Sequence, residues 1–498
     1  MGMPGMPIFY WAERMHVSYL PAGPNLVATE IPGAYQRYHI STRLAPDIEK
    51  WPSRFNVRVR KTGLAKLLIK ELIHYRGRLA PVLSRPCMYG VFSGPVGGFV
   101  PREQYCVGCL RCTTEFPDFV RVEHNLERRK LGDSYFSFTH VDSISYESST
   151  GLIPVKGAGY RGKFGGEGWD GMWTDMSEIV RPTRDGIHGR EFISTVVDIG
   201  YAPNFLLFDE NGEPYSSLPR SFSLPLPILF DASPNHSANK LAGIYAKAAA
   251  QIGSLAVLPF DEAVKLGEYS DSVVPVLRAE DGNRLSELSF TPRLIEMQGW
   301  DQRLFDALSE RFQDSIIALR TGFEDIESLS EYAERGVSVF HLLADLHGRS
   351  MDGRFVLDLI RAAHKTFVEA GIREEVTLIG SGGIIAAEHV AKAILCGLDA
   401  VALDTPLLVA LQARFDGEAI ERGNSSFTFP AALSEEWGVQ RLKNLAASWR
   451  DQLLEILGAM GLREVRRLRG EMGRAMFMRT LEVEAFAGIE GYEGGNRD

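Results

Sequence analysis

Short apolar runs alternate with amphipathic stretches along residues 225–410. The runs are rich in Val, Ile and Leu, as buried strands are. The stretches between them, such as HSANKLAGIYAKAAAQIG and MDGRFVLDLIRAAHKTFVEAG, repeat apolar residues at the spacing of one helix face. Eight such strand–helix units predict a (β/α)8 barrel, an α/β TIM-barrel fold. The predicted strands are 226–232, 254–260, 272–279, 293–299, 315–321, 337–345, 376–383 and 400–406.

A doubly wound open sheet is the alternative for this alternation. That fold usually has its phosphate-binding turn after the first strand. Here the Gly-rich turn GSGGI follows the seventh predicted strand, which favours the barrel. We therefore predict a barrel over residues 225–420, followed by an amphipathic, helical C-terminal extension over 421–498.

The residues before the barrel have weaker periodicity. We predict an N-terminal region over 1–135 and an irregular connector over 136–224 that covers the barrel. KTGLAKLLIKELIHYRGR (61–78) predicts a basic amphipathic helix, suited to a membrane or partner surface but more often packed on its own domain. Trp169 and Trp173 in the connector either shield a redox site or form an interface patch.

The composition is that of a folded, soluble protein, with 45% hydrophobic and 24% charged residues. A net charge of -10 argues against a general nucleic-acid binder, because binding phosphates requires clustered cations. The sequence contains no apolar run long enough to span a bilayer and no signal-peptide pattern at its start. These features predict a cytoplasmic location.

Four of the five cysteines fall within a short N-terminal window, and Cys396 lies apart. The stretch EQYCVGCLRCTTEFPDF (103–119) spaces its three cysteines as C-x2-C-x2-C, which lets three thiolates face one iron–sulfur cluster. Phe116 stands where a ferredoxin motif has a fourth cysteine, a residue that serves the other cluster in two-cluster ferredoxins. The metal ligands that we predict are Cys87, Cys106, Cys109 and Cys112.

A single [4Fe-4S] cluster in a ferredoxin-like region is the reading that we favour for these ligands. A [3Fe-4S] cluster on the three closely spaced cysteines is the fallback. A zinc site on the same four sulfurs is the alternative, although zinc sites usually combine two C-x2-C pairs.

The turn after the seventh strand is a candidate phosphate site, because phosphate binds in such barrels at the loops after strands seven and eight. Backbone N–H groups of Gly380, Ser381, Gly382 and Gly383 could approach a phosphate closely. Thr405, after the eighth strand, could donate a further hydrogen bond. Asp404 conflicts with this interpretation, because a carboxylate repels a phosphate unless it points away toward a basic residue.

Three stretches resemble the FMN-binding synthase domain of glutamate synthase, especially the short, ferredoxin-linked archaeal-type members. They are SEIVRPTRDGIHGREFISTVVDIG (177–200), LIGSGGIIAAEHVAKAILCGLDAVALDTPLLVAL (378–411) and LGAMGLREVRRLRGEMGRAMF (457–477). The resemblance runs in order over roughly residues 150–480.

This resemblance implies an iron–sulfur flavoprotein oxidoreductase. A cluster would feed electrons to FMN, and 2-oxoglutarate plus ammonia would be reduced to glutamate. The implied partners are an electron donor such as a ferredoxin or a reductase subunit, an ammonia-supplying subunit and a small-molecule substrate. The chain would then be an oligomer or one subunit of a larger electron-transfer complex.

Individual residues carry the resemblance further. Gly382 and Gly383 match the family's phosphate loop, and Gln298 matches a glutamine beside the flavin. Arg320 stands where the family has a lysine near the reducible edge of the flavin, where a cation would stabilise the reduced anion. An ordinary salt bridge at a strand end is the alternative role for Arg320.

The loops that face the substrate depart from the family pattern. In the sixth-strand loop ADLHGRSMDG (344–353), Asp345 and His347 are the best candidates for proton transfer to a substrate. A solvent-facing pair is the alternative. These departures leave two other functions open: the same cofactors acting on another substrate, or a flavin-free scaffold or binding subunit around one cluster.

Overall fold

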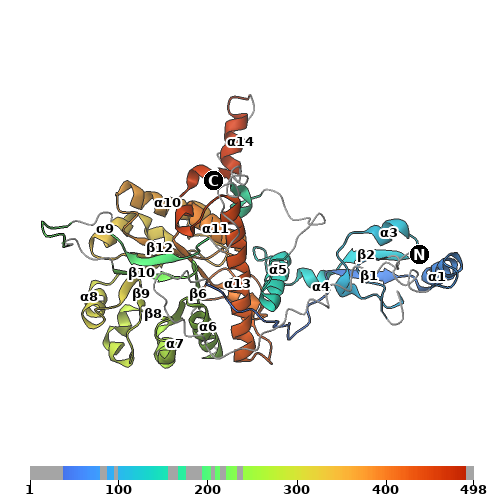
Figure 1. The fold of residues 1–498 in the computed structure, drawn as a ribbon, viewed down its shortest axis with the longest axis horizontal. Helices are drawn as coiled ribbons and strands as arrows, with labels where there is room; N and C mark the ends of the chain where they lie inside the picture. The colour runs from blue at the N-terminus through green and yellow to red at the C-terminus, as the bar shows by residue number, and fades with distance from the viewer. Residues whose placement is uncertain are drawn as a thin grey trace. The chain divides into compact units, whose positions relative to one another are not determined.

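The structure, a computed structural model, describes residues 38–78, 87–94, 99–154, 166–174, 193–203, 208–213, 220–232 and 239–489. Within it, Ile40–Asp498 forms one compact unit. Eight parallel strands close into a barrel in the order β10-β11-β12-β13-β6-β7-β8-β9 (Figure 1). Their bounds are β6 Ile228–Asp231, β7 Ala256–Pro259, β8 Val273–Leu277, β9 Leu294–Gln298, β10 Ile316–Gly322, β11 Val339–Leu343, β12 Thr377–Ser381 and β13 Ala400–Leu403.

The predicted barrel is confirmed: each predicted strand coincides with one observed strand, and only β10 runs past its predicted end, by one residue. The strands are buried because helices cover the outside of the sheet and side chains fill its interior, so they are apolar along almost their whole length. The exceptions are polar residues on several strands, which meet inside the barrel. The helices that follow the strands are α6 Asn239–Ile252, α7 Phe260–Ala263, α8 Gln302–Arg311, α9 Leu329–Glu334, α10 Val356–Glu369, α11 Ala387–Cys396 and α12 Thr405–Ala410.

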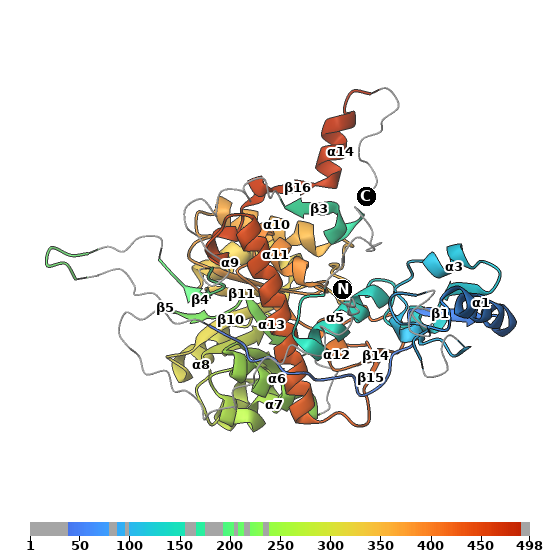
Figure 2. The same ribbon diagram turned by 45° about the vertical axis from the view of Figure 1, so that its right-hand side comes forward.

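The predicted C-terminal helical extension begins with the long helix α13 (Glu435–Ala459), which contacts α6, α11 and α5 (Phe138–Thr150) on the outside of the barrel (Figure 2). Arg441 of α13 is fully buried and donates to the carbonyl oxygens of Ala45 and Ala410. The extension ends in α14 (Met478–Phe486), which has no buried residue.

Two short ribbons join the barrel to the connector. β4 (Val197–Tyr201) pairs with β5 (Arg220–Leu224), and the N–H of Gly200 donates to Thr377 at the start of β12, so this ribbon lies at the amino-terminal end of the barrel. β3 (Met172–Thr174) pairs with β16 (Ala475–Phe477). The small ribbon β14 (Arg414–Phe415) and β15 (Phe427–Thr428) follows α12.

A separate small core surrounds the cysteines, and we call residues 51–130 the cysteine lobe. Its strands β1 (Phe55–Val59) and β2 (Val120–His124) pair antiparallel. Its helices are α1 (Lys61–His74), α3 (Arg111–Glu115) and α4 (Leu126–Arg129). The predicted helix over 61–78 is therefore present, although it ends at His74.

Several predictions fall outside the described residues. These include most of the connector, among it 155–165 and 175–192, and with it most of the first resembling stretch. The predicted domain boundaries and a ferredoxin-like fold for the lobe stay predictions. Among the helices that the structure describes, none is long and apolar enough to cross a membrane.

Candidate functional sites

Three of the four N-terminal cysteines lie at one apolar cluster, whereas Cys109 is exposed. Cys112 is buried in it beside Val57, Val91, Phe92 and Val120. Cys87, Cys106 and Phe116 are packed against it, although Cys87 is distant from the others in sequence. Phe116 thus lies in the apolar surroundings of the cysteines, as expected of a residue that has replaced a ligand of a lost second cluster.

The backbone curls around Cys109 through two left-handed residues. Gly108 has φ +68°, and a Cβ there would overlap the ring of Phe55. Leu110 has φ +60°, a conformation that costs a branched residue free energy and is found mainly at functional sites. The two turns place Cys106, Cys109 and Cys112 along one curled segment of backbone.

The thiols are close enough to interact electrostatically. Burial raises the pKa values of Cys106 and Cys112, and the charges of the neighbouring cysteines, Cys87 among them, raise them further. In a tetrahedral zinc site the sulfurs would lie about 3.8 Å apart, given Zn–S bonds of about 2.3 Å. No three of these four sulfurs, all in described residues, lie within 4.8 Å of one another. The single C-x2-C-x2-C triplet, in place of two C-x2-C pairs, is the pattern that favours an iron–sulfur cluster over a zinc ion.

The cysteine lobe exposes apolar side chains beside the cysteines and has an excess of basic residues in its sequence. Large side chains next to the cysteines in sequence are exposed, namely Met88, Tyr89, Tyr105, Val107 and Leu110. Cys109 is itself exposed. Residues 51–130 carry 15 Lys and Arg against 6 Asp and Glu, a net +9 in a chain of net -10.

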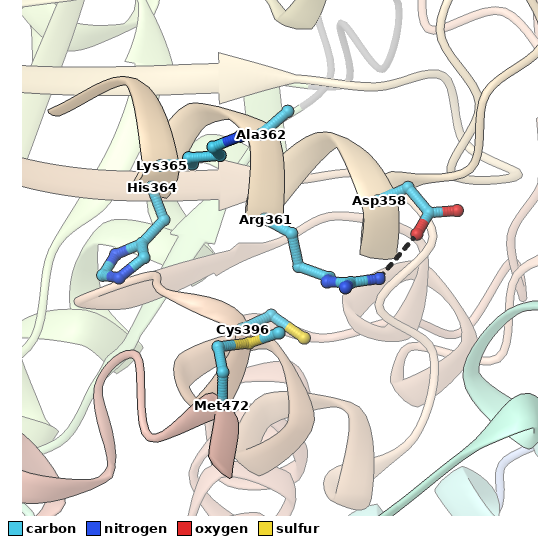
Figure 3. Close-up of a pocket in the computed structure, with 7 residues that line it drawn as sticks. All are labelled: Asp358, Arg361, Ala362, His364, Lys365, Cys396 and Met472. Carbon is cyan, nitrogen blue, oxygen red and sulfur yellow. Dashed lines mark hydrogen bonds and ion pairs between the residues drawn. The ribbon is translucent and has the colours of Figure 1, made fainter. Parts of the chain in front are cut away.

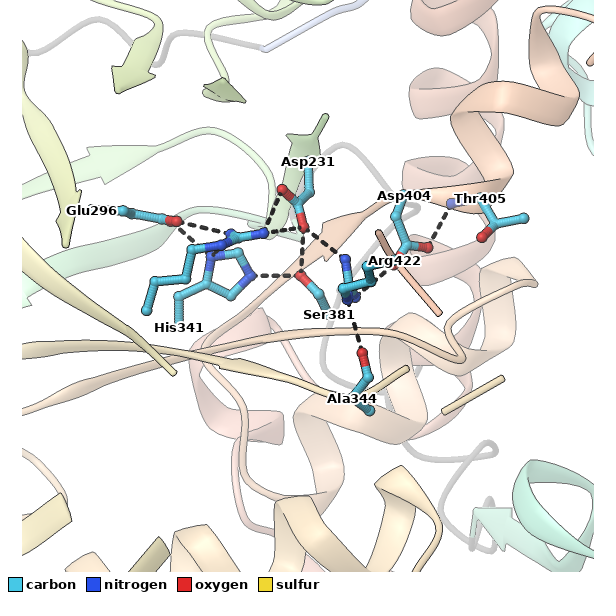
Figure 4. Close-up of polar contacts among 9 residues, drawn as sticks. Asp231, Glu296, His341, Ala344, Ser381, Asp404, Thr405 and Arg422 are labelled. Carbon is cyan, nitrogen blue, oxygen red and sulfur yellow. Dashed lines mark hydrogen bonds and ion pairs between the residues drawn. The ribbon is translucent and has the colours of Figure 1, made fainter. Parts of the chain in front are cut away.

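The second candidate site lies inside the barrel, where Asp231, Glu296 and His341 come together from different strands (Figure 4). Arg320 of β10 bonds to all three. Its guanidinium donates to both carboxylate oxygens of Asp231 on β6, each at 3.0 Å. It also donates to Glu296 of β9 at 2.9 Å and lies 2.9 Å from Nδ1 of His341 on β11. Arg320 is only 4% exposed, so its charge is neutralised inside the barrel.

His341 connects this ion pair to the seventh strand. Its Nδ1 lies 2.7 Å from Glu296 and its Nε2 lies 2.5 Å from Oγ of Ser381. Ser381 also donates to Asp231 at 3.2 Å. Ser381, His341 and Glu296 are linked in the order nucleophile, base and acid of a catalytic triad. All three side chains are buried, so they hold the strands together and offer no exposed nucleophile. The side chain of Ser381 points into this network (Figure 4).

Arg422, from the segment between β14 and β15, closes the network at the mouth of the barrel. It donates to Asp404 at 2.7 Å, to Asp231 at 3.1 Å and to the carbonyl oxygen of Ala344 at 2.8 Å. Asp404 in turn accepts from the N–H of Thr405, the first residue of α12, at 2.5 Å. Asp404 therefore does pair with a basic residue. Its carboxylate nevertheless lies at the end of the eighth strand, where the phosphate is predicted to bind.

The pKa values of the two carboxylates at the mouth, Asp231 and Asp404, are shifted in opposite directions. Burial raises the pKa of Asp231, but Arg320 and Arg422 outweigh it and lower the value to about 2. Burial also raises the pKa of Asp404, and the charge of Asp231 adds to this rise, whereas Arg422 and the N–H of Thr405 oppose it. The pKa of Asp404 is consequently above its usual 3.8.

The GSGGI turn packs tightly against the loop after β11. A Cβ on Gly382 would overlap the carbonyl oxygens of Ala344 and Asp345, and one on Gly383 would lie 2.5 Å from Cα of Gly348. The carbonyl oxygen of Gly383 accepts from Tyr135 Oη at 2.6 Å and from Trp169 Nε1 at 2.8 Å. The two glycines are therefore required by contacts within the protein.

Trp169 is buried over this turn and stacks on His389 of α11, with ring centroids 5.2 Å apart. It therefore covers the loop after the seventh strand. Gln298, at the end of β9, is exposed, and the N–H of the following Gly299 donates to the carbonyl oxygen of Arg320.

Asp345 and His347 do not face one another across a site. Asp345 accepts from the N–H of Arg349 and closes its own turn. His347 Nε2 lies 2.9 Å from Asp133 and stacks on Tyr135, so it fastens the loop to residues 133–135. Glu418 completes a group that could hold a cation, but the Asp133 carboxylate already accepts from three backbone N–H groups, those of Tyr135, Phe136 and Ala419.

Two cavities lie away from both sites. One, of about 290 Å³, is lined by α10, Cys396 and Met472 (Figure 3). Its Arg361 pairs with Asp358 at 3.2 Å, and burial with nearby Arg373 lowers the pKa of His364 to about 4. The other, of about 430 Å³, lies between Trp173 and α14. Neither contains a set of converging polar groups free to bind a ligand.

Comparison with known proteins identifies the class to which this barrel belongs. Residues 352–416, from the loop after β11 to β14, match the family model "Conserved region in glutamate synthase". The chain is therefore an α/β-barrel protein that is similar to glutamate synthases over these residues, as the sequence predicts.

Two curated relatives and one solved structure illustrate the similarity. The archaeal-type glutamate synthase [NADPH] of Dehalococcoides mccartyi is 23% identical over 440 residues, which cover 74% of this chain and 86% of that protein. The archaeal glutamate synthase [NADPH] of Methanocaldococcus jannaschii is 34% identical over 121 residues, 23% of this chain and 24% of that one. An IMP dehydrogenase/GMP reductase-like protein from Corynebacterium glutamicum has a TM-score of 0.36 at 12% identity, covering 58% of this chain and 90% of that chain.

The sequence analysis missed four residues of the barrel network: Asp231, Glu296, His341 and Arg422. The first three are polar residues within otherwise apolar strand runs, in ILFD, LIEMQ and VFHLL. A charged residue in a buried strand must be paired, so this pattern could have predicted the network. Arg422 lies in a loop and gave no such signal.

Proposed function

We propose that the chain is an iron–sulfur redox protein of the glutamate synthase kind, in which Cys87, Cys106, Cys109 and Cys112 hold one [4Fe-4S] cluster. The observation that supports this proposal is the C-x2-C-x2-C triplet together with the packing of Cys87, Cys106 and Cys112 at one apolar core. Such a cluster supplies one-electron transfer. Val57, Phe92 and Phe116 exclude water from its inner side.

The surface of the cysteine lobe supports docking of an acidic electron carrier, such as a ferredoxin or an acidic reductase subunit. Lys61, Lys66 and Lys70 on α1 are exposed and form no ion pair with any described residue. Gly63 of the same helix lies against Phe119, which packs on the cysteine core, so these cations lie near the centre. A basic ring around an apolar patch attracts and orients an acidic partner.

Iron and sulfide analysis of anaerobically purified protein tests the cluster. About three to four irons per chain are expected, with a reduced-state electron paramagnetic resonance signal. One zinc per chain without iron would refute the proposal.

Docking is tested by the rate at which a reduced acidic ferredoxin reduces the centre. The double variant Lys66→Glu, Lys70→Glu should slow this reaction at low salt, and the difference should shrink as salt rises because the charges are then screened. Lys365→Glu on α10 is the matched control, since Lys365 is an exposed lysine outside the lobe. Equal rates in all three proteins would contradict the docking surface.

The second candidate is an FMN-dependent enzyme that passes electrons from the cluster to a flavin and forms glutamate from 2-oxoglutarate and ammonia, the latter from solution or another subunit. The similarity to an archaeal-type glutamate synthase over 440 residues favours it. Glutamate formation with a reduced carrier, measured together with flavin content, tests it. Flavin without glutamate would indicate a different small-molecule substrate.

A further inference from the structure

The end of the barrel at β12 and β13 is where a barrel of this kind binds a phosphate group. A phosphate would need two features there: backbone N–H groups that are free to donate to it, and surroundings that tolerate its two negative charges. In this chain the place for the negative charges is taken by a carboxylate of the protein itself.

The place for the negative charge is taken by Asp404. Its carboxylate accepts from the N–H of Thr405 at 2.5 Å, in the position from which the start of α12 would face a phosphate. The side chain is 3% exposed, so no water layer separates it from an incoming anion. A phosphate at this point would meet a buried carboxylate at close range.

The balancing cation is also internal. Arg422 bridges Asp404 and Asp231 and fastens both to the carbonyl oxygen of Ala344 on the sixth-strand loop. Arg320 balances Asp231 and Glu296 below it. The mouth therefore contains a closed set of ion pairs across six segments.

The glycines of the seventh-strand turn give no independent support for a phosphate. Gly382 and Gly383 have φ +97° and +68°, and their missing side chains leave room for residues 344–348. Tyr135 and Trp169 cover the turn through the carbonyl oxygen of Gly383. The turn is thus explained by packing between two loops.

We infer that the Asp404–Arg422 pair takes the place of the cofactor phosphate, so that this barrel is closed by its own ion pairs and does not bind FMN. The thiols of the cysteine lobe have no part in this inference. Iron content and flavin affinity are separate measurements, so one can fail without the other.

Titration of the full-length protein with FMN, followed by flavin fluorescence, tests the inference directly. We expect no saturable binding, with any Kd weaker than about 0.1 mM. Tight, stoichiometric FMN in the wild-type protein would overturn the inference, and this outcome requires no variant to fold.

The Asp404→Asn variant sharpens the test, because it removes the charge but keeps the shape of the side chain and leaves Arg422 facing the site. FMN affinity should rise at least about tenfold, whereas riboflavin, which lacks the phosphate, should show no gain. Asp416→Asn is the matched control: Asp416 bonds Ser426 and Thr428 in the exposed ribbon, so its loss should change neither affinity. A folded Asp404→Asn variant without any gain for FMN would contradict the role assigned to Asp404.

Discussion

The cysteine lobe and the barrel mouth differ in how their reactive groups are partnered. In the barrel, Asp231, Glu296, Asp404, Arg320 and Arg422 all have ion-pair partners within the protein. In the cysteine lobe, Cys87, Cys106 and Cys112 pack at one apolar core, Cys109 is exposed, and none of the four forms a disulfide. The comparison indicates that the polar groups of a barrel can be paired with one another while the groups that are free to bind a ligand lie in another region, here the cysteine lobe.

The energetics of the two regions follow from this difference. A buried network of charges is costly to break, because the remaining members become uncompensated charges in a medium of low polarity. Removing one thiol from the cysteine lobe leaves no uncompensated buried charge, so it costs the fold little free energy of unfolding. It should nevertheless abolish metal binding. Four predictions test this contrast, from the largest expected effect to the smallest.

The largest effect is expected for Cys109→Ser. Removing one of four ligands should abolish the stable cluster and its visible absorption, since Cys109 lies on the segment that the left-handed residues Gly108 and Leu110 curl. Iron per chain and the absorption spectrum are the measurements. Cys396→Ala is the control, because Cys396 is buried in α11 beside Met172 and should leave the iron content unchanged. Equal iron loss in both variants would show that the cysteine lobe does not hold the metal.

In the barrel, Arg320→Met should lower the free energy of unfolding by about 3–5 kcal/mol, because Asp231 and Glu296 are left without their main cation. Denaturant unfolding measures this change. Arg335→Met removes an exposed pair with Glu331 and should cost about 0.5 kcal/mol or less. A loss at Arg320 as small as that at Arg335 would contradict a closed network.

Packing of the glycine turn predicts a smaller effect for Gly383→Ala. The new Cβ would need the backbone at Gly348 to move, so we expect a loss of about 2–4 kcal/mol from positive φ and overlap together. Gly371→Ala isolates the first contribution, since Gly371 has φ +73° and open space around it, and should cost about 1–2 kcal/mol. If both variants lose the same stability, the turn is not packed as described.

The smallest effect concerns pH. Burial lowers the pKa of His347, but its hydrogen bond and charge interaction with Asp133 outweigh this, so the pKa lies above 6.5. A raised pKa stabilises the fold fully below pH 6.5 and less as pH rises through the folded value. Denaturant unfolding from pH 5.5 to 8.5 should therefore show a decline of under about 1 kcal/mol that is absent in His347→Gln. The same slope in both proteins would remove His347 as the cause.

Sequence patterns predicted the barrel well because its strands are nearly continuous apolar runs separated by helical periodicity. They also predicted Cys87 as a fourth ligand, and Cys87 packs at the same apolar core as Cys106 and Cys112, although its role as a ligand stays a prediction. The barrel mouth was harder, because GSGGI fits two physical explanations: a phosphate cradle or a close approach of two loops. Only the contacts of Gly382 and Gly383 with residues 344–348, and the position of Arg422, distinguish them.

The central claim is that the redox chemistry of this chain resides in the cysteine lobe and not in a flavin at the barrel mouth. Its most direct test is the ratio of iron to flavin in one sample of anaerobically purified, full-length protein. The account predicts about three to four irons per chain and no stoichiometric FMN. One FMN per chain, with or without iron, or protein that contains no iron, would contradict it.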